Sequence, residues 1–180
     1  EFNKAVLYKN YNNKENQINE ILWALNITGY ECKYSDPRFS KTYEYGIFRE
    51  QYMTLEEYKK KYFDSSRPYT VGLLESNMYV SNGQLQPYYA LIKSLEAKGC
   101  NVIPVVAAGG SENQLKVMVK YFTNAPSYEA YLNNPLKYTN NVNAIISMPE
   151  YGIGGNLFDN TTKYFETAGV PVFRAVHSDY

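Results

Sequence analysis

Two glutamates, Glu75 and Glu150, are the residues of this sequence best placed to do chemistry together. Each follows a short run of apolar and β-branched residues that predicts a buried strand, Thr70–Leu74 for the first and Val142–Met148 for the second. If these strands are neighbours, the two carboxylates could face each other and share a proton or hold a cation. The alternative is that both are solvated loop residues.

Two glycine-rich turns could bring backbone N–H groups close to a ligand. Gly109 and Gly110 precede Ser111, and Gly154 and Gly155 belong to a later loop. Glycine lets a backbone approach a ligand closely, and a helix N-terminus offers unpaired N–H groups to an anion. The dinucleotide fingerprint and GxxxxGK[ST] are both missing from the sequence, so nucleotide binding is disfavoured and turn geometry accounts for these glycines.

The sequence offers little for nucleophilic or metal chemistry. His177 is the single histidine, and no GxSxG elbow precedes a predicted helix. Cys32 and Cys100 are too few for a thiolate metal site. One disulfide between them is possible, but two unpaired thiols are the expectation. We therefore assign no catalytic residue and no metal ligand.

Residues 67–180 alternate predicted strands with predicted helices, and this order suggests a single domain. The strands are expected at Thr70–Leu74, Asn101–Ala107, Val142–Met148 and Val170–Val176. The helices are expected at 85–98, 111–123 and 156–168. Such an order is typical of parallel βαβ units with right-handed crossovers, so we predict an α/β fold with a flavodoxin-like open parallel sheet.

Open α/β sheets bind ligands beyond the carboxyl ends of their strands, near the point where the strand order reverses. This rule selects the segments 75–83, 107–111 and 149–155. The candidate ligand-binding residues in them are Glu75, Asn77, Tyr79, Asn82, Gly109, Gly110, Ser111, Glu150, Tyr151, Gly154 and Gly155.

Residues 1–66 are expected to form an N-terminal α/β segment and a connector. Strands are possible at 4–8 and 30–34, a helix is predicted at 15–25, and 36–52 is loop-like. Thr54 and Glu57 have the spacing of a capping box that opens a helix ending near Tyr62. Tyrosines crowd residues 43–69, where they could stack on a flat aromatic ligand or pack against the sheet.

Composition restricts the class of partner. The chain has 180 residues, and its 18 Lys and Arg balance its 18 Asp and Glu. Nucleic acids and anionic membranes select basic surfaces, so neither is expected as the main partner. No apolar run approaches the roughly 18 residues that a transmembrane helix needs. Because the chain does not begin with Met, we expect it to be an internal piece of a longer protein.

Several stretches of the sequence match, in order, the motifs of one known family. The most specific is YALIKSLEAKGCNVIPVV at 89–106, which is similar to the family run "aLI..LEa.G.nViPvf". Further matches are PYTVGLL at 68–74, AAGG at 107–110, VNAIIS at 142–147 and AGVPV at 168–172. Upstream, GIF at 46–48 and LEEY at 55–58 are similar to the family motifs "GIyHP" and "eeYl". By these stretches the chain resembles the large subunits of cobaltochelatase (CobN) and magnesium chelatase.

The resemblance implies an internal domain of a cytoplasmic chelatase large subunit. Such a subunit binds a tetrapyrrole for insertion of Co²⁺ or Mg²⁺ in biosynthesis of the cobalamin or chlorophyll type. ATP would be hydrolysed by AAA+ partner subunits, so no tightly bound cofactor is expected here. The fragment alone is expected to be inactive.

Some family positions carry other residues in this sequence. The Arg and His of the family loop "YRSH" fall on Asn77 and Tyr79, and the His of "GIYHP" falls on Arg49. The motif "GLD" becomes Gly110-Ser111-Glu112. These changes leave open a second hypothesis, a divergent extracellular or cell-surface module that binds a ligand without inserting metal.

Overall fold

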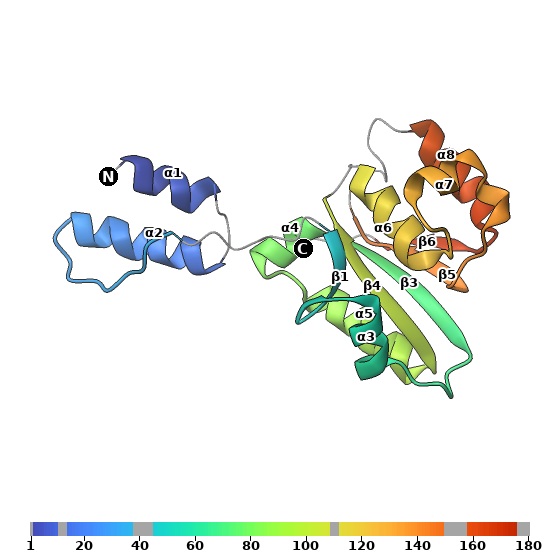
Figure 1. Ribbon diagram of the computed structural model, residues 1–180. Coiled ribbons are helices and arrows are strands. Elements are labelled where there is room, and N and C mark those ends of the chain that lie inside the picture. The colour runs from blue at the N-terminus through green and yellow to red at the C-terminus, as the bar shows by residue number, and fades with distance from the viewer. Residues whose placement is uncertain (1, 11–13, 38–44, 109–111, 150–157, 176–180) are drawn as a thin grey trace. The chain divides into compact units, whose positions relative to one another are not determined.

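The structure is a computed structural model of the 180-residue chain and describes residues 2–10, 14–37, 45–108, 112–149 and 158–175 (Figure 1). Contacts divide the chain into two compact units. The smaller unit comprises residues 1–42 and 79–84, and the larger comprises 43–78 and 85–180. The sequence suggests instead a domain boundary after residue 66, and this boundary stays a prediction.

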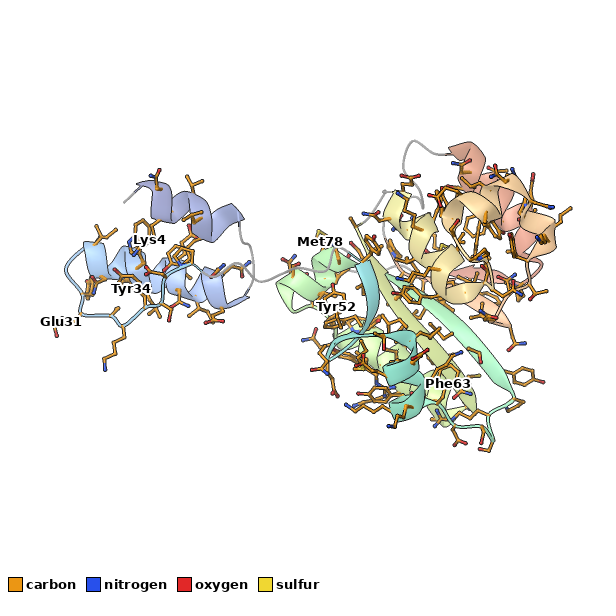
Figure 2. The ribbon with its side chains drawn as sticks, in the orientation of Figure 1. Lys4, Glu31, Tyr34, Tyr52, Phe63 and Met78 are labelled. Carbon is orange, nitrogen blue, oxygen red and sulfur yellow. The ribbon has the colours of Figure 1, made fainter. Side chains whose placement is uncertain are left out.

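The smaller unit is built on two helices, α1 (Phe2–Asn10) and α2 (Lys14–Ile27). The buried rings of Tyr8 and Trp23 lie 6.0 Å apart between them. The irregular segment 30–37 is tied to these helices, because the Tyr8 hydroxyl donates to the Ser35 carbonyl and the Ser35 N–H donates to Asn19 Oδ1 at 2.7 Å. Figure 2 shows Lys4 beside Tyr34, with its ammonium 5.2 Å from the ring centre.

Two strands expected in this region are therefore wrong. Residues 4–8 belong to α1, since Lys, Ala and Leu favour helix and Tyr8 finds its partner on a second helix. Residues 30–34 are irregular and pair with no described strand, and the Cys32 carbonyl accepts instead from Asn26 Nδ2 at 3.1 Å. The helix predicted at 15–25 is confirmed as α2.

The described residues of the larger unit form a six-stranded sheet in the order β2-β1-β4-β3-β5-β6. Its strands are β1 (Tyr45–Arg49), β2 (Gln51–Met53), β3 (Tyr69–Ser76), β4 (Cys100–Ala107), β5 (Ala144–Ser147) and β6 (Val172–Arg174). Strands β3 to β6 pair in parallel, and β1 and β2 add antiparallel pairs. In chain order the parallel strands lie 2-1-3-4, which is the flavodoxin-like order, so the predicted α/β fold is confirmed.

Helices cover both faces of this sheet. Figure 1 shows α5 on one side and α6, α7 and α8 on the other. The described helices of this unit are α3 (Leu55–Tyr62), α5 (Gln86–Ala97), α6 (Glu112–Phe122), α7 (Tyr128–Asn133), the 3₁₀ turn η1 (Pro135–Lys137) and α8 (Phe158–Ala168). Helix α4 (Asn77–Asn82) begins in this unit, and its residues from Tyr79 onward belong to the smaller one. The predicted capping box is present, because Thr54 Oγ1 accepts from the Glu57 N–H at 3.2 Å and Glu57 Oε2 accepts from the Thr54 N–H at 2.9 Å.

A side chain of helix α6 packs directly on the backbone of the sheet at Gly72, in the middle of β3. A Cβ atom added at Gly72 would lie 2.8 Å from two ring carbons of Phe122. The Phe122 ring is fully buried, among Leu74, Ile103 and other core residues. Glycine is therefore required at this position by the packing of the ring against the strand.

Arg49, at the end of β1, joins three elements. Its guanidinium donates to both carboxylate oxygens of Glu96 on α5, at 2.6 and 3.0 Å, and lies 4.1 Å from the centre of the Tyr62 ring on α3. The Arg49 and Glu96 side chains are only 15% and 16% exposed. Burial favours the neutral form of Arg49, but the hydrogen bonds to Glu96 outweigh it and raise the pKa of Arg49 above its usual value.

The structure corrects two loop expectations. Strands β1 and β2 begin within the segment 36–52, which the sequence predicts as a loop. Glu75 to Asn82 are the end of β3 followed by α4. Cys32 and Cys100 are unpaired, as expected. No helix among the described residues is long and apolar enough to cross a membrane.

Strand β6 is the outer strand on its side of the sheet. It pairs only with β5 among the described strands. All three of its residues are exposed, including Val172 at 38% and Phe173 at 56%. Parallel strands are usually covered on both faces, so the part of the chain that the structure describes leaves this edge unusually exposed.

Candidate functional site

The order of the parallel strands reverses at β3, which has β4 on one side and β5 on the other. Ligands of open α/β sheets bind outside the carboxyl ends of the strands at this point. Here β3 ends at Ser76 and β5 ends at Ser147, and the two ends are joined because the Met148 N–H donates to the Leu74 carbonyl at 2.9 Å. This end of the sheet is the candidate site that the sequence selected.

Glu75 is the candidate residue that the structure places most clearly. Its side chain is fully buried, and Oε1 accepts the Ser76 N–H at 2.7 Å. Burial is the main reason that the pKa of Tyr88 lies well above its usual value, and the charge of Glu75 adds to this shift. The Tyr88 hydroxyl stays protonated and donates to the Phe48 carbonyl at 2.8 Å. Glu75 is therefore a buried carboxylate at the strand reversal, in place of the loop residue that the sequence suggested.

The other candidates are divided between the two units or lie outside the described residues. Asn77 begins α4 and is half-buried, close to Glu75 in the larger unit. Tyr79 is buried and Asn82 is exposed, and both belong to the smaller unit. The candidates outside the described residues are Gly109, Gly110, Ser111, Glu150, Tyr151, Gly154 and Gly155. The pairing of Glu75 with Glu150 therefore stays a prediction.

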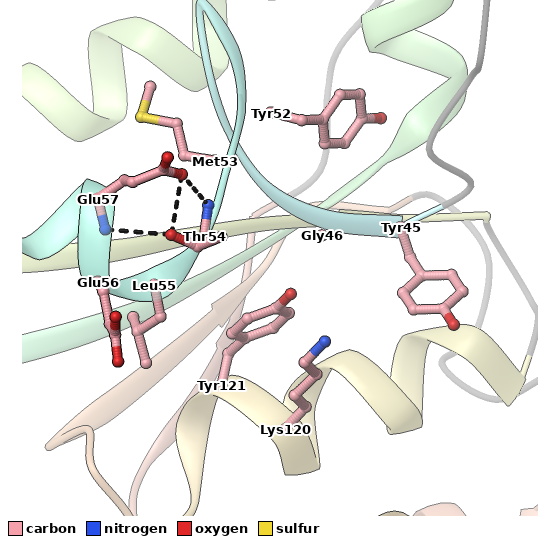
Figure 3. Close-up of a pocket in the computed structure, with 10 residues that line it drawn as sticks. All are labelled: Tyr45, Gly46, Tyr52, Met53, Thr54, Leu55, Glu56, Glu57, Lys120 and Tyr121. Carbon is pink, nitrogen blue, oxygen red and sulfur yellow. Dashed lines mark hydrogen bonds between the residues drawn. The ribbon is translucent and has the colours of Figure 1, made fainter.

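A pocket of about 870 Å³ lies elsewhere in the larger unit, between strands β1 and β2, the start of α3 and the end of α6 (Figure 3). Its lining residues are Tyr45, Gly46, Tyr52, Met53, Thr54, Leu55, Glu56, Glu57, Lys120 and Tyr121. The crowding of tyrosines in residues 43–69 was a partial signal for this pocket. Lys120 and Tyr121 come from a helix far along the chain, so no local pattern could add them.

The hydroxyl of Tyr52, which lines this pocket, is expected to lose its proton at a higher pH than an ordinary tyrosine. Burial raises its pKa from the usual 10.0 to about 12. As pH rises, the Tyr52 hydroxyl ionises in the unfolded chain before it ionises in the folded protein. Between pH 10 and 12 the wild type should therefore lose stability relative to a Tyr52→Phe variant, and below pH 10 it should not. The ultraviolet absorbance of tyrosinate, recorded for both proteins against pH, isolates Tyr52 as the difference. A difference curve centred near 10 would contradict this burial effect.

The comparison with known families identifies the family of this chain. Residues 6–180 match the sequence profile of the family described as CobN/Magnesium Chelatase. This chain belongs to the CobN/magnesium chelatase family. Among proteins of curated function, none matches the sequence significantly.

A solved structure with a similar fold supports the architecture of this family member. It is the catalytic subunit of cobaltochelatase from Mycobacterium tuberculosis, with a TM-score of 0.56 and 11% sequence identity. The likeness covers 96% of this chain and 13% of that chain, so the CobN-family segment described here corresponds to a small part of that subunit. At this identity the likeness concerns the fold alone.

The structure also shows what occupies the position where the CobN-family resemblance implies a histidine. Arg49 stands there, and its guanidinium is bound to Glu96 and packed on Tyr62. Among the described residues, no group of three or more His, Cys, Asp or Glu side chains could hold a metal ion. Arg49 therefore has a structural role in this CobN-family chain.

Proposed function

We propose that this chain is an internal domain of a chelatase large subunit, and that the sheet end formed by β3 and β5 contributes to binding a tetrapyrrole. The observation that carries the proposal is the family match across residues 6–180. The buried carboxylate of Glu75 at the strand reversal supports it, because ligand sites of open α/β sheets gather there.

In this proposal the tetrapyrrole and Co²⁺ or Mg²⁺ are substrates of a ligase that forms nitrogen–metal bonds in the cytoplasm. ATP is hydrolysed by separate AAA+ subunits, which act as partners of the complete large subunit. This domain holds the ring and positions it through Glu75, Asn77 and the neighbouring loops. It carries no assigned catalytic residue and acts only within the assembled chelatase.

The proposal is tested by titrating the protein with a metal-free porphyrin and with a metal-free corrinoid, using ligand absorbance and fluorescence. Wild-type protein should bind one of them saturably. Asn77→Ala should weaken binding by roughly tenfold, the loss of one polar contact. Glu75→Gln should weaken it by a similar factor, because the fully buried Glu75 carboxylate positions the end of β3 through the Ser76 N–H. Asn133→Ala, an exposed asparagine at the end of α7, is the matched control and should bind like the wild type.

Two results would overturn this site. One is the absence of saturable binding to either ligand by a folded wild-type protein. The other is unchanged affinity in both Glu75→Gln and Asn77→Ala when circular dichroism shows that the variants are folded.

A second candidate function is a divergent module that binds a ligand without metal insertion. The observation that favours it is the structural role of Arg49, together with Asn77 and Tyr79 at the other positions where the resemblance implies Arg and His. Porphyrin binding by the complete protein, without metal insertion when AAA+ subunits and ATP are supplied, would select this second function. Metal insertion under those conditions would exclude it.

A further inference from the structure

We propose that the pocket formed by β1, β2, α3 and α6 is a second ligand site, which takes a fused-ring aromatic molecule carrying an acidic group. The proposal goes beyond the tetrapyrrole function, because this pocket does not include any of the candidate residues at the carboxyl ends of the strands. Its volume of about 870 Å³ lies within the range of small-molecule sites, roughly 300–1,000 Å³.

Two tyrosine side chains of the pocket lie on either side of Gly46, which has no side chain. A Cβ atom at Gly46 would lie 3.6 Å from a ring carbon of Tyr52 and 3.9 Å from the Tyr121 hydroxyl. Because Gly46 has no such atom, the space between Tyr52 of β2 and Tyr121 of α6 stays open. A planar ring can enter there and stack or meet a tyrosine edge, which are the geometries that aromatic pairs favour.

The tyrosine side chains that line the pocket are held in place by their own packing in the ligand-free protein. Tyr121 is only 8% exposed, and the Tyr52 ring packs edge-on against Phe48, with the ring centres 5.0 Å apart. Tyr45 completes the aromatic side of the pocket, and its side chain is 38% exposed (Figure 3). A preformed pocket loses little freedom when it binds a rigid ligand, which favours affinity.

The charges of the pocket select an acidic group at one end. Lys120 has no ion pair with another described residue, and its ammonium lies 5.1 Å from the centre of the Tyr121 ring. Figure 3 shows that the Lys120 ammonium and the Tyr121 hydroxyl point toward β1, the strand that carries Tyr45 and Gly46. An ammonium beside phenol hydroxyls is a donor set for a carboxylate or sulfonate.

The acidic residues of the pocket do not oppose this assignment. Glu57 Oε2 already accepts from the Thr54 N–H at 2.9 Å and from the Thr54 hydroxyl at 2.8 Å, so its charge is engaged in the capping box. Figure 3 shows Glu56 and Glu57 on the side of the pocket opposite to Lys120. The anionic end of a ligand therefore belongs at Lys120 and its ring between the tyrosines.

The probe for this site is 8-anilinonaphthalene-1-sulfonate, whose fluorescence rises in an apolar site. The wild-type protein should bind it saturably. Lys120→Met and Tyr45→Ala should each weaken binding by roughly tenfold, because one removes the cation and the other an aromatic wall. Matched controls are Lys116→Met, on the same helix but outside the pocket, and Tyr69→Ala, at the exposed start of β3. Both should bind like the wild type.

Two further probes separate the sources of affinity. N-phenyl-1-naphthylamine has the rings without the sulfonate, so it should bind more weakly and be indifferent to Lys120→Met. A metal-free porphyrin should not displace the sulfonate probe, because the two sites lie on opposite faces of the sheet: the pocket is on the side of Tyr121 of α6, and Glu75 of the proposed tetrapyrrole site is on the side of Tyr88 of α5.

Three results would overturn the second site. They are the absence of saturable probe binding by a folded protein, equal affinity in both pocket variants and their controls, and competitive displacement of the probe by the porphyrin. The last would make the pocket part of the tetrapyrrole site. The failure of porphyrin binding alone would leave this inference standing.

Discussion

Replacement of Gly72 by alanine is expected to lower the free energy of unfolding by about 2–3 kcal/mol, the cost of overpacking a filled core. The added methyl group would lie 2.8 Å from ring carbons of Phe122. Since Phe122 is fully buried between α6 and the sheet, its ring has nowhere to move. Urea unfolding followed by circular dichroism measures the effect; tryptophan fluorescence does not, because Trp23 belongs to the smaller unit.

Shortening the Phe122 side chain provides the control for Gly72→Ala. Phe122→Leu leaves a cavity and should be destabilising alone, but the shorter side chain makes room for a methyl group at position 72. Gly72→Ala introduced into Phe122→Leu should therefore cost less than in the wild type, with a coupling energy of about 1 kcal/mol or more. Strict additivity, or a Gly72→Ala variant as stable as the wild type, would show that the strand and ring can separate.

Removal of the Glu96 carboxylate is the second large effect that we expect. Glu96→Ala should cost about 2–3 kcal/mol, because it leaves the mostly buried guanidinium of Arg49 without its two hydrogen bonds. The Arg67 guanidinium lies 3.9 Å from the same carboxylate, so two like charges would then face each other. Urea unfolding of the variant measures the loss.

An exposed pair on α6 is the matched control for this carboxylate. Glu112 and Lys116 are 3.0 Å apart but 44% and 38% exposed, so Glu112→Ala should cost about 0.5 kcal/mol or less. The double variant Arg49→Met with Glu96→Met should be more stable than Glu96→Ala, since no unpaired charge remains. Equal losses from Glu96→Ala and Glu112→Ala would contradict the importance of burial.

Much of the parallel sheet could be predicted because its signals are local. Apolar β-branched runs marked β3, β4 and β5, and Gly99 and Gly169 follow the helices whose ends they predicted, with φ angles of +81° and +62°. Only glycine adopts such angles readily, so these stops were visible in the sequence.

Strands β1 and β2 could not be predicted because their partners are distant or very short. β1 pairs with Val105, Val106 and Ala107 of β4, far along the chain, and with the three-residue β2. Nothing local distinguishes these residues from a tyrosine-rich loop. For the same reason the pocket, which needs Lys120 and Tyr121 of α6, escaped sequence reasoning.

The candidate site was predictable in position and less so in character. Glu75 does stand at the carboxyl end of a parallel strand where the strand order reverses. Its complete burial arises in the folded protein, where it pairs with Val106 of β4 and its charge acts on Tyr88 of α5, and the spacing of residues does not reveal this. The family match therefore rests on the whole sequence pattern, while the site rests on a few side chains.

The bare outer strand β6 has a consequence for handling this protein at high concentration. Among the described strands β6 pairs on its β5 side alone, and its Val172 and Phe173 are exposed. An edge strand of this kind is a template on which extended chains assemble. Two copies that meet along this edge could continue the sheet from one molecule into the next. Turbidity and particle size that grow with protein concentration would then originate at the apolar edge strand β6. The zero formal net charge of the chain provides little electrostatic repulsion to oppose this association.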